Sequence, residues 1–505
     1  DGAITATAAG LLTATNVVAG GATGDSVTLS TTTGGSVATL VTGADAVSIT
    51  ASAGDVTLGA VEATAGTLGV TATTGSINDA ADDATTDLTA GGLITLTAQD
   101  EIGGNPVAGT ATDTAGSIEL FAGSSVNVSS TTAGSIVLAG AGALTLTDVD
   151  TADGAITATA AGLLTATNVV STTDADANDI TLTSTGGAIG VTMVTAGATA
   201  GDVTLDAQGG AITDGNGATN NVTADVLTAD ATTGIDLDTT IVSLDLDNAT
   251  SGNVDISETD AITVVNATQA TTGNIQIVAG GQITLDSDGT PANVVSTLST
   301  GTVTIDANGD SSLVVNDGIS TASGNVILTA DDDVTFAADG DIASASGNVT
   351  VTADADGDAS GTGGALIMVD GALINAGSGT IDLDADENIV IGGLVTTDAT
   401  GSAIDVASVN GSITDAGDAH VDITASTGSA AVTLSAMNAI GTVSGDEVFL
   451  DPDDTGYAGN PLETAILSLS ATTSTADSDI AIDNTSASGL TLTALDAGGT
   501  GNAAS

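Results

Sequence analysis

The chain has 505 residues, of which 64 are Asp or Glu and none is Lys or Arg, so its formal net charge at pH 7 is −64. Binding to nucleic acid or to an anionic membrane surface needs basic side chains, so we expect neither as a direct partner. We expect cations as partners, and calcium above all, because calcium prefers several carboxylate and carbonyl oxygens at once.

The composition nevertheless supports a buried core. High charge with few aromatic residues is typical of disorder, but 41% of the residues are apolar and only four are proline. With three Phe, one Tyr, no Trp and no Cys, the core has to be built from Ile, Val, Leu and Ala without disulfides. No apolar run is long enough to span a membrane. The sequence begins at Asp1 without a basic, apolar leader, so we expect either a removed leader or an internal piece of a longer protein.

The first predicted elements belong to a copied segment. Residues 1–18 read DGAITATAAGLLTATNVV, and residues 153–170 repeat them without a change. The two halves of this segment look like strands of one coil. The segment that precedes the second copy, 143–152, resembles 490–498 near the C-terminal end. We therefore expect an array that grew by duplication of blocks and whose end could lead back into its beginning.

A shorter motif, glycine followed by a small or polar residue and then two alternating aliphatic residues, recurs along the chain. It occurs as GDVTL at 54 and 201, GSIEL at 116, GSIVL at 134, GNVDI at 252, GNIQI at 273, GTVTI at 301, GNVIL at 324, GNVTV at 347 and GTIDL at 379. Its spacing clusters near 20 to 24 residues, the range typical of solenoids. Within 273–289, Ile275 and Ile277 alternate with polar residues, which predicts half-buried strands. The predicted fold is all-β: a parallel β-helix (β-solenoid) with roughly 20–24 residues per coil and about 24 coils.

One region departs from this pattern. Residues 445–464 contain two of the four prolines and the only Tyr, and they lack the alternation. We therefore predict a continuous β-solenoid over 1–444, an irregular loop or insertion over 445–464, and resumed coils over 465–505. A shorter irregularity is expected around 103–109.

Dense acidic turns are the predicted calcium ligands. The three candidate groups are Asp354, Asp356 and Asp358; Asp174, Asp176 and Asn178; and Asp451, Asp453 and Asp454. Alternate carboxylates around a glycine resemble loops that wrap a cation with successive side chains. The alternative is that each group is a solvated turn, since Asp favours turns through hydrogen bonds to its own backbone.

No catalytic group stands out, and we predict no enzyme activity. The only His, His420, is expected to face solvent, and a pair of catalytic carboxylates cannot be singled out among so many. Repeated Thr-x-Thr pairs leave ice binding as a less favoured alternative, and carbohydrate binding is another.

The glycine-led, Thr-rich coils resemble the giant β-strand-repeat surface proteins of bacteria, which include filamentous-haemagglutinin-like exoproteins and large adhesins. The resemblance implies a right-handed helix and an extracellular or cell-surface location. The leading hypothesis is a structural protein that forms a stiff acidic rod. This rod would be part of a filament, surface layer or matrix fibre, would associate with itself head to tail or laterally, and would be screened by divalent cations. The alternative is a passive stalk of a large adhesin. Neither hypothesis involves insertion into a membrane.

Overall fold

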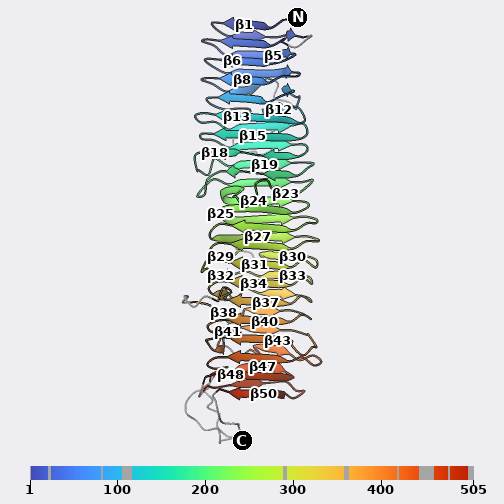
Figure 1. The fold of residues 1–505 in the computed structure, drawn as a ribbon, viewed down its shortest axis with the longest axis vertical. Helices are drawn as coiled ribbons and strands as arrows, with labels where there is room; N and C mark the ends of the chain where they lie inside the picture. Colours follow the sequence, from blue (N-terminus) through green and yellow to red (C-terminus); the bar gives the residue numbers. More distant parts are fainter. Residues whose placement is uncertain are drawn as a thin grey trace. The chain divides into compact units, whose positions relative to one another are not determined.

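The structure is a computed structural model that describes residues 2–20, 24–80, 84–104, 116–287, 293–357, 363–417, 420–442, 460–475 and 478–498. The regular elements of these residues are all β-strands, and no helix among them is long and apolar enough to cross a membrane. The strands are parallel and stack in about 19 turns of a β-solenoid, which confirms the predicted fold class. Figure 1 shows how the strands of successive turns lie above one another.

The chain divides into two compact units, Asp1–Asn248 and Ala249–Ser505, and each is described by itself. The strands of unit 1 are β1 (Ile4–Ala8), β2 (Leu12–Ala14), β3 (Val17–Ala19), β4 (Val27–Thr31), β5 (Ser36–Gly43), β6 (Val47–Ala51), β7 (Val56–Ala63), β8 (Leu68–Ala72), β9 (Ile77–Asp79), β10 (Leu88–Ala90), β11 (Ile94–Ala98), β12 (Ile118–Leu120), β13 (Ser124–Ser130), β14 (Ile136–Gly140), β15 (Leu144–Thr151), β16 (Ile156–Ala160), β17 (Leu164–Ala166), β18 (Val169–Ser171), β19 (Ile180–Ser184), β20 (Ile189–Val191), β21 (Val194–Thr195), β22 (Val203–Ala207), β23 (Ile212–Asp214), β24 (Val222–Ala231) and β25 (Ile235–Asn248).

The strands of unit 2 are β26 (Val254–Glu258), β27 (Ile262–Gln269), β28 (Ile275–Ala279), β29 (Ile283–Leu285), β30 (Val295–Thr297), β31 (Val303–Ala307), β32 (Leu313–Val315), β33 (Ile319–Thr321), β34 (Val326–Ala330), β35 (Val334–Phe336), β36 (Ile342–Ser344), β37 (Val349–Ala353), β38 (Leu366–Met368), β39 (Leu373–Asn375), β40 (Ile381–Ala385), β41 (Ile389–Ile391), β42 (Gly393–Val395), β43 (Ile404–Ser408), β44 (Ile413–Asp415), β45 (Ile423–Ala425), β46 (Val432–Ala436), β47 (Leu462–Ile466), β48 (Ser468–Thr473), β49 (Ile482–Asn484) and β50 (Thr491–Ala497).

The core of each unit consists of aliphatic columns. In unit 2, Ile275, Val303, Val326 and Val349 lie in register in successive turns, and each is fully buried. Along a strand, buried and partly exposed residues alternate, as in β31, where Val303, Ile305 and Ala307 point inward. A strand of this length cannot bury its apolar face alone, so the stacking of turns supplies the core.

Turn length varies along the chain. Val303 and Val326 are 23 residues apart, within the predicted range, but Ile94 and Val126 are also register neighbours and are 32 residues apart. Because turns such as this one exceed the predicted length, the described residues form about 19 turns and not the predicted 24.

The structure explains the glycine of the recurring motif. In unit 2, Gly273, Gly301, Gly324 and Gly347 lie one above another, and a Cβ on any of them would lie within 2 Å of a carbonyl oxygen of the preceding glycine in the column. The next residue holds the turns together: the Asn348 backbone N–H donates to Oδ1 of Asn325 over 3.0 Å. Glycine is therefore required by close approach, and the polar residue caps the following turn.

The predicted domain boundaries fall partly outside the described residues. The structure does not describe 443–459, which includes most of the predicted irregular region 445–464, and it describes the resumed coils only up to residue 498 with a gap at 476–477. Where the chain is described again, Asn460 pairs with Thr442 and β47 begins at Leu462, slightly before the predicted boundary at 465.

Candidate metal centres

The predicted ligands Asp174 and Asn178 hold a loop together. Asp174 Oδ2 accepts hydrogen bonds from the hydroxyl and the backbone N–H of Thr199, at 2.6 and 3.1 Å, and Oδ1 accepts one from the N–H of Gly201. These bonds, led by the Thr199 hydroxyl, hold the pKa of Asp174 below its ordinary value. Asn178 Nδ2 donates to Asp153 Oδ1 over 2.8 Å, and Asp176 is exposed. Asp174 and Asn178 are thus already hydrogen-bonded to other residues, and a metal at this loop stays a prediction.

The other predicted ligands are only partly described. Asp354 follows β37 with a left-handed backbone (φ 59°), and its carbonyl accepts a hydrogen bond from the N–H of Gly357. Asp356 is exposed. Asp358, Asp451, Asp453 and Asp454 lie outside the described residues, so metal binding by these groups also stays a prediction.

The structure instead brings together three carboxylates that are distant in the sequence. In unit 1, Asp79 ends β9, Asp87 directly precedes β10, and Glu119 is the middle residue of β12. One carboxylate oxygen from each residue lies within 4.8 Å of the others. Asp87 and Glu119 are only 5% and 6% exposed. We call this group the first acidic cluster.

Backbone pairing fixes the geometry of the first acidic cluster. The N–H of Asp87 donates to the carbonyl of Glu119 over 2.9 Å, and the N–H of Glu119 donates to Asp87 Oδ2 over 3.0 Å. The Ser117 hydroxyl donates to Glu119 Oε1 over 2.5 Å, whereas Glu119 Oε2 is buried and accepts no hydrogen bond from the protein.

Unit 2 repeats the arrangement with different residues. Asp415 ends β44, Asp422 directly precedes β45, and Glu463 is the second residue of β47; one oxygen of each again lies within 4.8 Å of the others. The N–H of Asp422 donates to the Glu463 carbonyl over 2.8 Å, and the N–H of Glu463 donates to Asp422 Oδ2 over 2.7 Å. We call this group the second acidic cluster. Its backbone pairing matches that of the first.

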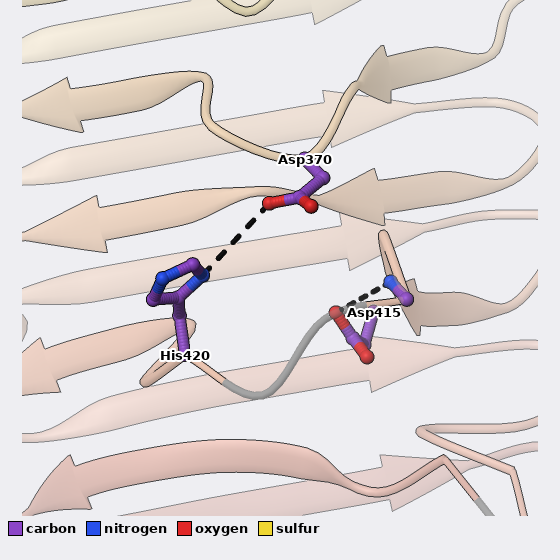
Figure 2. Close-up of polar contacts among 4 residues, drawn as sticks. Asp370, Asp415 and His420 are labelled. Atoms are coloured by element: carbon purple, nitrogen blue, oxygen red, sulfur yellow. Dashed lines mark hydrogen bonds and ion pairs between the residues drawn. The ribbon is translucent and has the colours of Figure 1, made fainter.

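One carboxylate oxygen of Asp415 in the second acidic cluster lacks a hydrogen-bond donor. Oδ1 accepts a hydrogen bond from the Gly417 N–H over 2.9 Å, which Figure 2 draws, whereas Oδ2 is buried without a hydrogen-bond partner. Asp415 is 7% exposed and Asp422 is fully buried. The cluster therefore concentrates negative charge where water has little access.

Both clusters show the electrostatic cost of crowded carboxylates. Burial raises the pKa of Asp87 to about 9, and the neighbouring Glu119 and Asp79 add to this effect. Burial likewise raises the pKa of Glu119, and it raises the pKa of Glu463 with help from the charge of Asp415. These carboxylates need either protons or a cation to lie together in the folded protein.

A third turn, in unit 1, has the same backbone arrangement, but an uncharged Asn side chain takes the position of Asp87 and Asp422. Asp214 ends β23 and Asn221 directly precedes β24. Asn221 exchanges two hydrogen bonds with Asp238, because its N–H donates to the Asp238 carbonyl and its Oδ1 accepts from the Asp238 N–H. The amide nitrogen of the fully buried Asn221 lies 2.8 to 2.9 Å from Asp214 Oδ1, Asn216 Oδ1 and the Val191 carbonyl oxygen. In this turn the Asn221 amide donates hydrogen bonds at the position where the acidic clusters have a carboxylate of Asp87 or Asp422.

The only histidine does not neutralise the second acidic cluster. His420 lies between Asp415 and Asp422 in the sequence, but its Nδ1 faces Asp370 Oδ1 at 3.8 Å (Figure 2). This is the one ion pair in the described part of the chain, and both side chains are exposed, at 78% and 55%. The expectation that His420 faces solvent is confirmed.

Sequence reasoning missed both acidic clusters, because their members are not neighbours in the sequence. The signal that could have found them is an acidic residue directly before an apolar strand, at Asp87 and Asp422, with a Glu in a strand of the next turn. Comparison with known proteins adds no ligand information: no family model, curated protein or solved structure matches this chain.

Proposed function

We propose that this chain is a structural segment of an extracellular or cell-surface filament, in which solenoid turns stack end to end and cations screen the acidic surface. The extracellular location rests on the resemblance to bacterial β-strand-repeat surface proteins. End-to-end stacking rests on the internal copy of residues 1–18, because the second copy already stacks on β15 within the chain.

The strand β50 repeats the features of β15. The sequence of β50, TLTALDA, aligns with TLTDVDT in β15, so that Leu492 and Leu495 correspond to Leu146 and Val149. Both strands carry one extra Thr at the aligned place, a bulge between Leu146 and Asp148 in β15 and between Leu492 and Ala494 in β50. The two strands therefore present the same edge to a strand that stacks on them.

Within the chain, the neighbours of β15 are strands of the second copy. β15 pairs with β17 and β18, which belong to residues 153–170, and Leu146 and Val149 are fully buried beneath them. The first copy supplies β2 and β3, which have the same residues except that Ala19 stands where β18 has Ser171. The corresponding Leu492 and Leu495 of β50 are 53% and 54% exposed. Stacking of β2 and β3 from one chain on β50 of another would reproduce a contact that the protein already makes once.

The burial of the two copies supports the same conclusion. Ile156 in β16 is fully buried, whereas the identical residue Ile4 in β1 is partly exposed. A preceding turn, β14, covers β16, and no described strand covers β1 from that side. Burial of the aliphatic side chains at both faces would drive association, at about 25 cal/mol per Å² of apolar surface.

Filament growth tests this proposal. We expect the purified chain, at high protein concentration and in salt, to form linear assemblies that lengthen with concentration, measured by negative-stain electron microscopy and sedimentation velocity. Leu495→Asp places a charge on the proposed stacking face and should abolish the assemblies. Val409→Asp, at an exposed aliphatic residue far from that face in the sequence (66% exposed), is the matched control and should leave them unchanged. Isolated chains at every concentration, or equal loss in both variants, would refute end-to-end stacking.

A further inference from the structure

We propose that each acidic cluster binds one hard divalent cation, with calcium as the preferred ion. The ligands in unit 1 are carboxylate oxygens of Asp79, Asp87 and Glu119, and those in unit 2 are carboxylate oxygens of Asp415, Asp422 and Glu463. No Lys or Arg exists in the chain to neutralise these groups, and the one His pairs elsewhere. These residues differ from the Asp-rich turns that the sequence suggested.

The first argument is a buried oxygen that lacks a donor in each cluster. Glu119 Oε2 and Asp415 Oδ2 have no hydrogen-bond partner, and their residues are 6% and 7% exposed. A buried acceptor without a partner costs about 1–3 kcal/mol, and more when it is charged. A cation held among the three carboxylates satisfies these oxygens.

The second argument is the neutral counterpart at Asn221. In all three places a residue directly before a strand caps the next turn with a side-chain oxygen, and an Asp that ends the preceding strand lies beside it. At Asn221 the amide nitrogen directs the partial positive charge of its N–H groups at three oxygens 2.8 to 2.9 Å away. Where Asp87 and Asp422 replace this amide, a metal ion supplies the missing positive charge at the same position.

The register also identifies a further oxygen near each cluster. Val191, whose carbonyl accepts from the Asn221 amide, is the register partner of Asp214. The residues at its place in the other two turns are Leu58, which pairs with Asp79, and Ile391, which pairs with Asp415. Three carboxylates and a carbonyl form an all-oxygen set. Because the carboxylates are largely buried, calcium suits the sites better than magnesium, which retains several of its waters.

The cation would join strands that are separated in the sequence by residues outside the described part of the chain. Glu119 and Glu463 lie in the first strands after residues 105–115 and 443–459, whereas the two Asp residues of each cluster lie before those segments. In unit 1 the ladder between these turns is short, because β10 and β12 share one register pair, Leu88 with Leu120. A metal bridge would therefore fix the register between the turns that it joins.

Calcium binding to the intact chain tests the proposal. Equilibrium dialysis of the EDTA-treated protein with radioactive calcium, in about 1 M NaCl, separates tight sites from the diffuse cation atmosphere because the Debye length is then only about 3 Å. We expect a tight component of two ions per chain, and weaker retention of magnesium. If protons alone neutralise the clusters, no tight calcium component will appear at neutral pH, and the proposal is wrong. Tighter retention of magnesium would overturn the preference for calcium.

Asp→Asn variants assign the ions to the clusters. Asp87→Asn and Asp422→Asn each keep the capping oxygen and add the amide found at Asn221, so each should remove one tight ion, and together they should remove both. In EDTA these variants should melt at or above the wild-type temperature, which separates lost binding from lost folding. Asp341→Asn is the matched control: Asp341 Oδ1 also caps the next turn, at the N–H of Leu373, but it belongs to neither cluster. Retention of both ions in Asp87→Asn and Asp422→Asn would overturn the assignment.

The reverse change tests the comparison with Asn221. Asn221→Asp replaces the amide by a carboxylate beside Asp214 and Asp238, so we expect one additional tight calcium ion per chain. The variant should melt below wild type in EDTA, and calcium should restore its melting temperature. A variant that is folded by circular dichroism but binds no additional calcium would contradict the argument.

Discussion

Single aspartates on the strand surfaces differ according to what lies above and below them. Asp206, Asp230 and Asp247 are in register in β22, β24 and β25, so like charges stack at the spacing of the ladder. Burial, followed by the charges of these neighbours and of Asp245, raises the pKa of Asp230. By contrast, Asp306 lies beside Thr329, whose hydroxyl donates to it. The same residue type is thus unfavourable in one column and hydrogen-bonded in another.

The raised pKa of Asp230 predicts a gain in stability on neutralisation. A carboxyl whose pKa is higher in the folded state stabilises the fold while it is protonated, below the ordinary pKa of Asp, and this contribution is lost as the pH rises through the folded-state value. Asp230→Asn should therefore raise the free energy of unfolding at pH 7, by about 0.5 kcal/mol for removal of one like-charge pair. The gain should shrink near pH 4. Urea unfolding followed by circular dichroism at both pH values measures it.

Asp306→Asn serves as the comparison for this experiment. It removes a charge of the same sign from the same kind of strand position, but it weakens the hydrogen bond from Thr329. We expect no gain, or a small loss, at pH 7. Equal stabilisation by both variants would mean that total charge, and not the aspartate column, sets the effect.

At the scale of the strand and its corner, the glycine column limits how closely turns can stack. The Gly324 position leaves no room for a side chain, since a Cβ there would lie 1.7 Å from the Gly301 carbonyl oxygen. Polar caps at the next position, such as Asn325 to Asn348, then connect each corner to the following one. Corner geometry, as well as the apolar core, therefore sets the register in unit 2.

Substitution in the glycine column should be far more costly than substitution of other glycines. Gly324→Ala forces the two turns apart, and we expect it to lower the free energy of unfolding by about 3 kcal/mol, the upper range for overpacking. Gly69→Ala, in β8, meets no atom within 4 Å and should be neutral or slightly stabilising. Thermal unfolding of the two variants decides the point, and similar melting temperatures would contradict the role of close approach.

Strands of this protein could be predicted because their pattern is local. The alternation at Ile275 and Ile277 is enough to identify β28, and the fold class follows from its repetition. The acidic clusters could not be found in this way. Glu119 meets Asp87 from 32 residues away and Glu463 meets Asp422 from 41 residues away, so the two separations differ.

Asp-rich corners show what the sequence leaves open about cation ligands. Runs of Asp at corners suggested a metal at Asp174, but its carboxylate is already used by the N–H groups and hydroxyl of the next turn. Composition alone does not distinguish an aspartate that caps a loop from one that lacks a donor. That distinction depends on which backbone groups the register places opposite each side chain.

For the molecule as a whole, the dominant feature is charge of one sign. With a formal charge of −64 and a single exposed ion pair among the described residues, hardly any carboxylate has a cationic partner within the protein. Such self-repulsion opposes the compact state and is reduced by dissolved ions. The stability of this solenoid should therefore depend on the medium more strongly than that of a protein with mixed charges.

Salt dependence tests this expectation independently of the two proposed metal sites. In EDTA, the urea midpoint should rise steadily as NaCl increases from about 0.01 M to about 0.15 M, over which the Debye length falls from about 30 Å to about 8 Å. Sucrose at matched osmolality controls for effects other than screening. A midpoint that does not change with NaCl would show that repulsion among the carboxylates contributes little.

The two copies of residues 1–18 have one further consequence. The second copy enters the solenoid in register with the turns on either side of it, as Ile156 does between Ile136 and Ile180. A gene that gains or loses a block of this kind changes the count of turns and leaves every side chain on its proper face. Insertion of one residue inside a strand would instead exchange core and surface for the rest of that strand, unless a bulge accommodates it as at Thr147 in β15. Recombination of whole blocks therefore allows such a protein to change its number of turns while every core side chain stays buried.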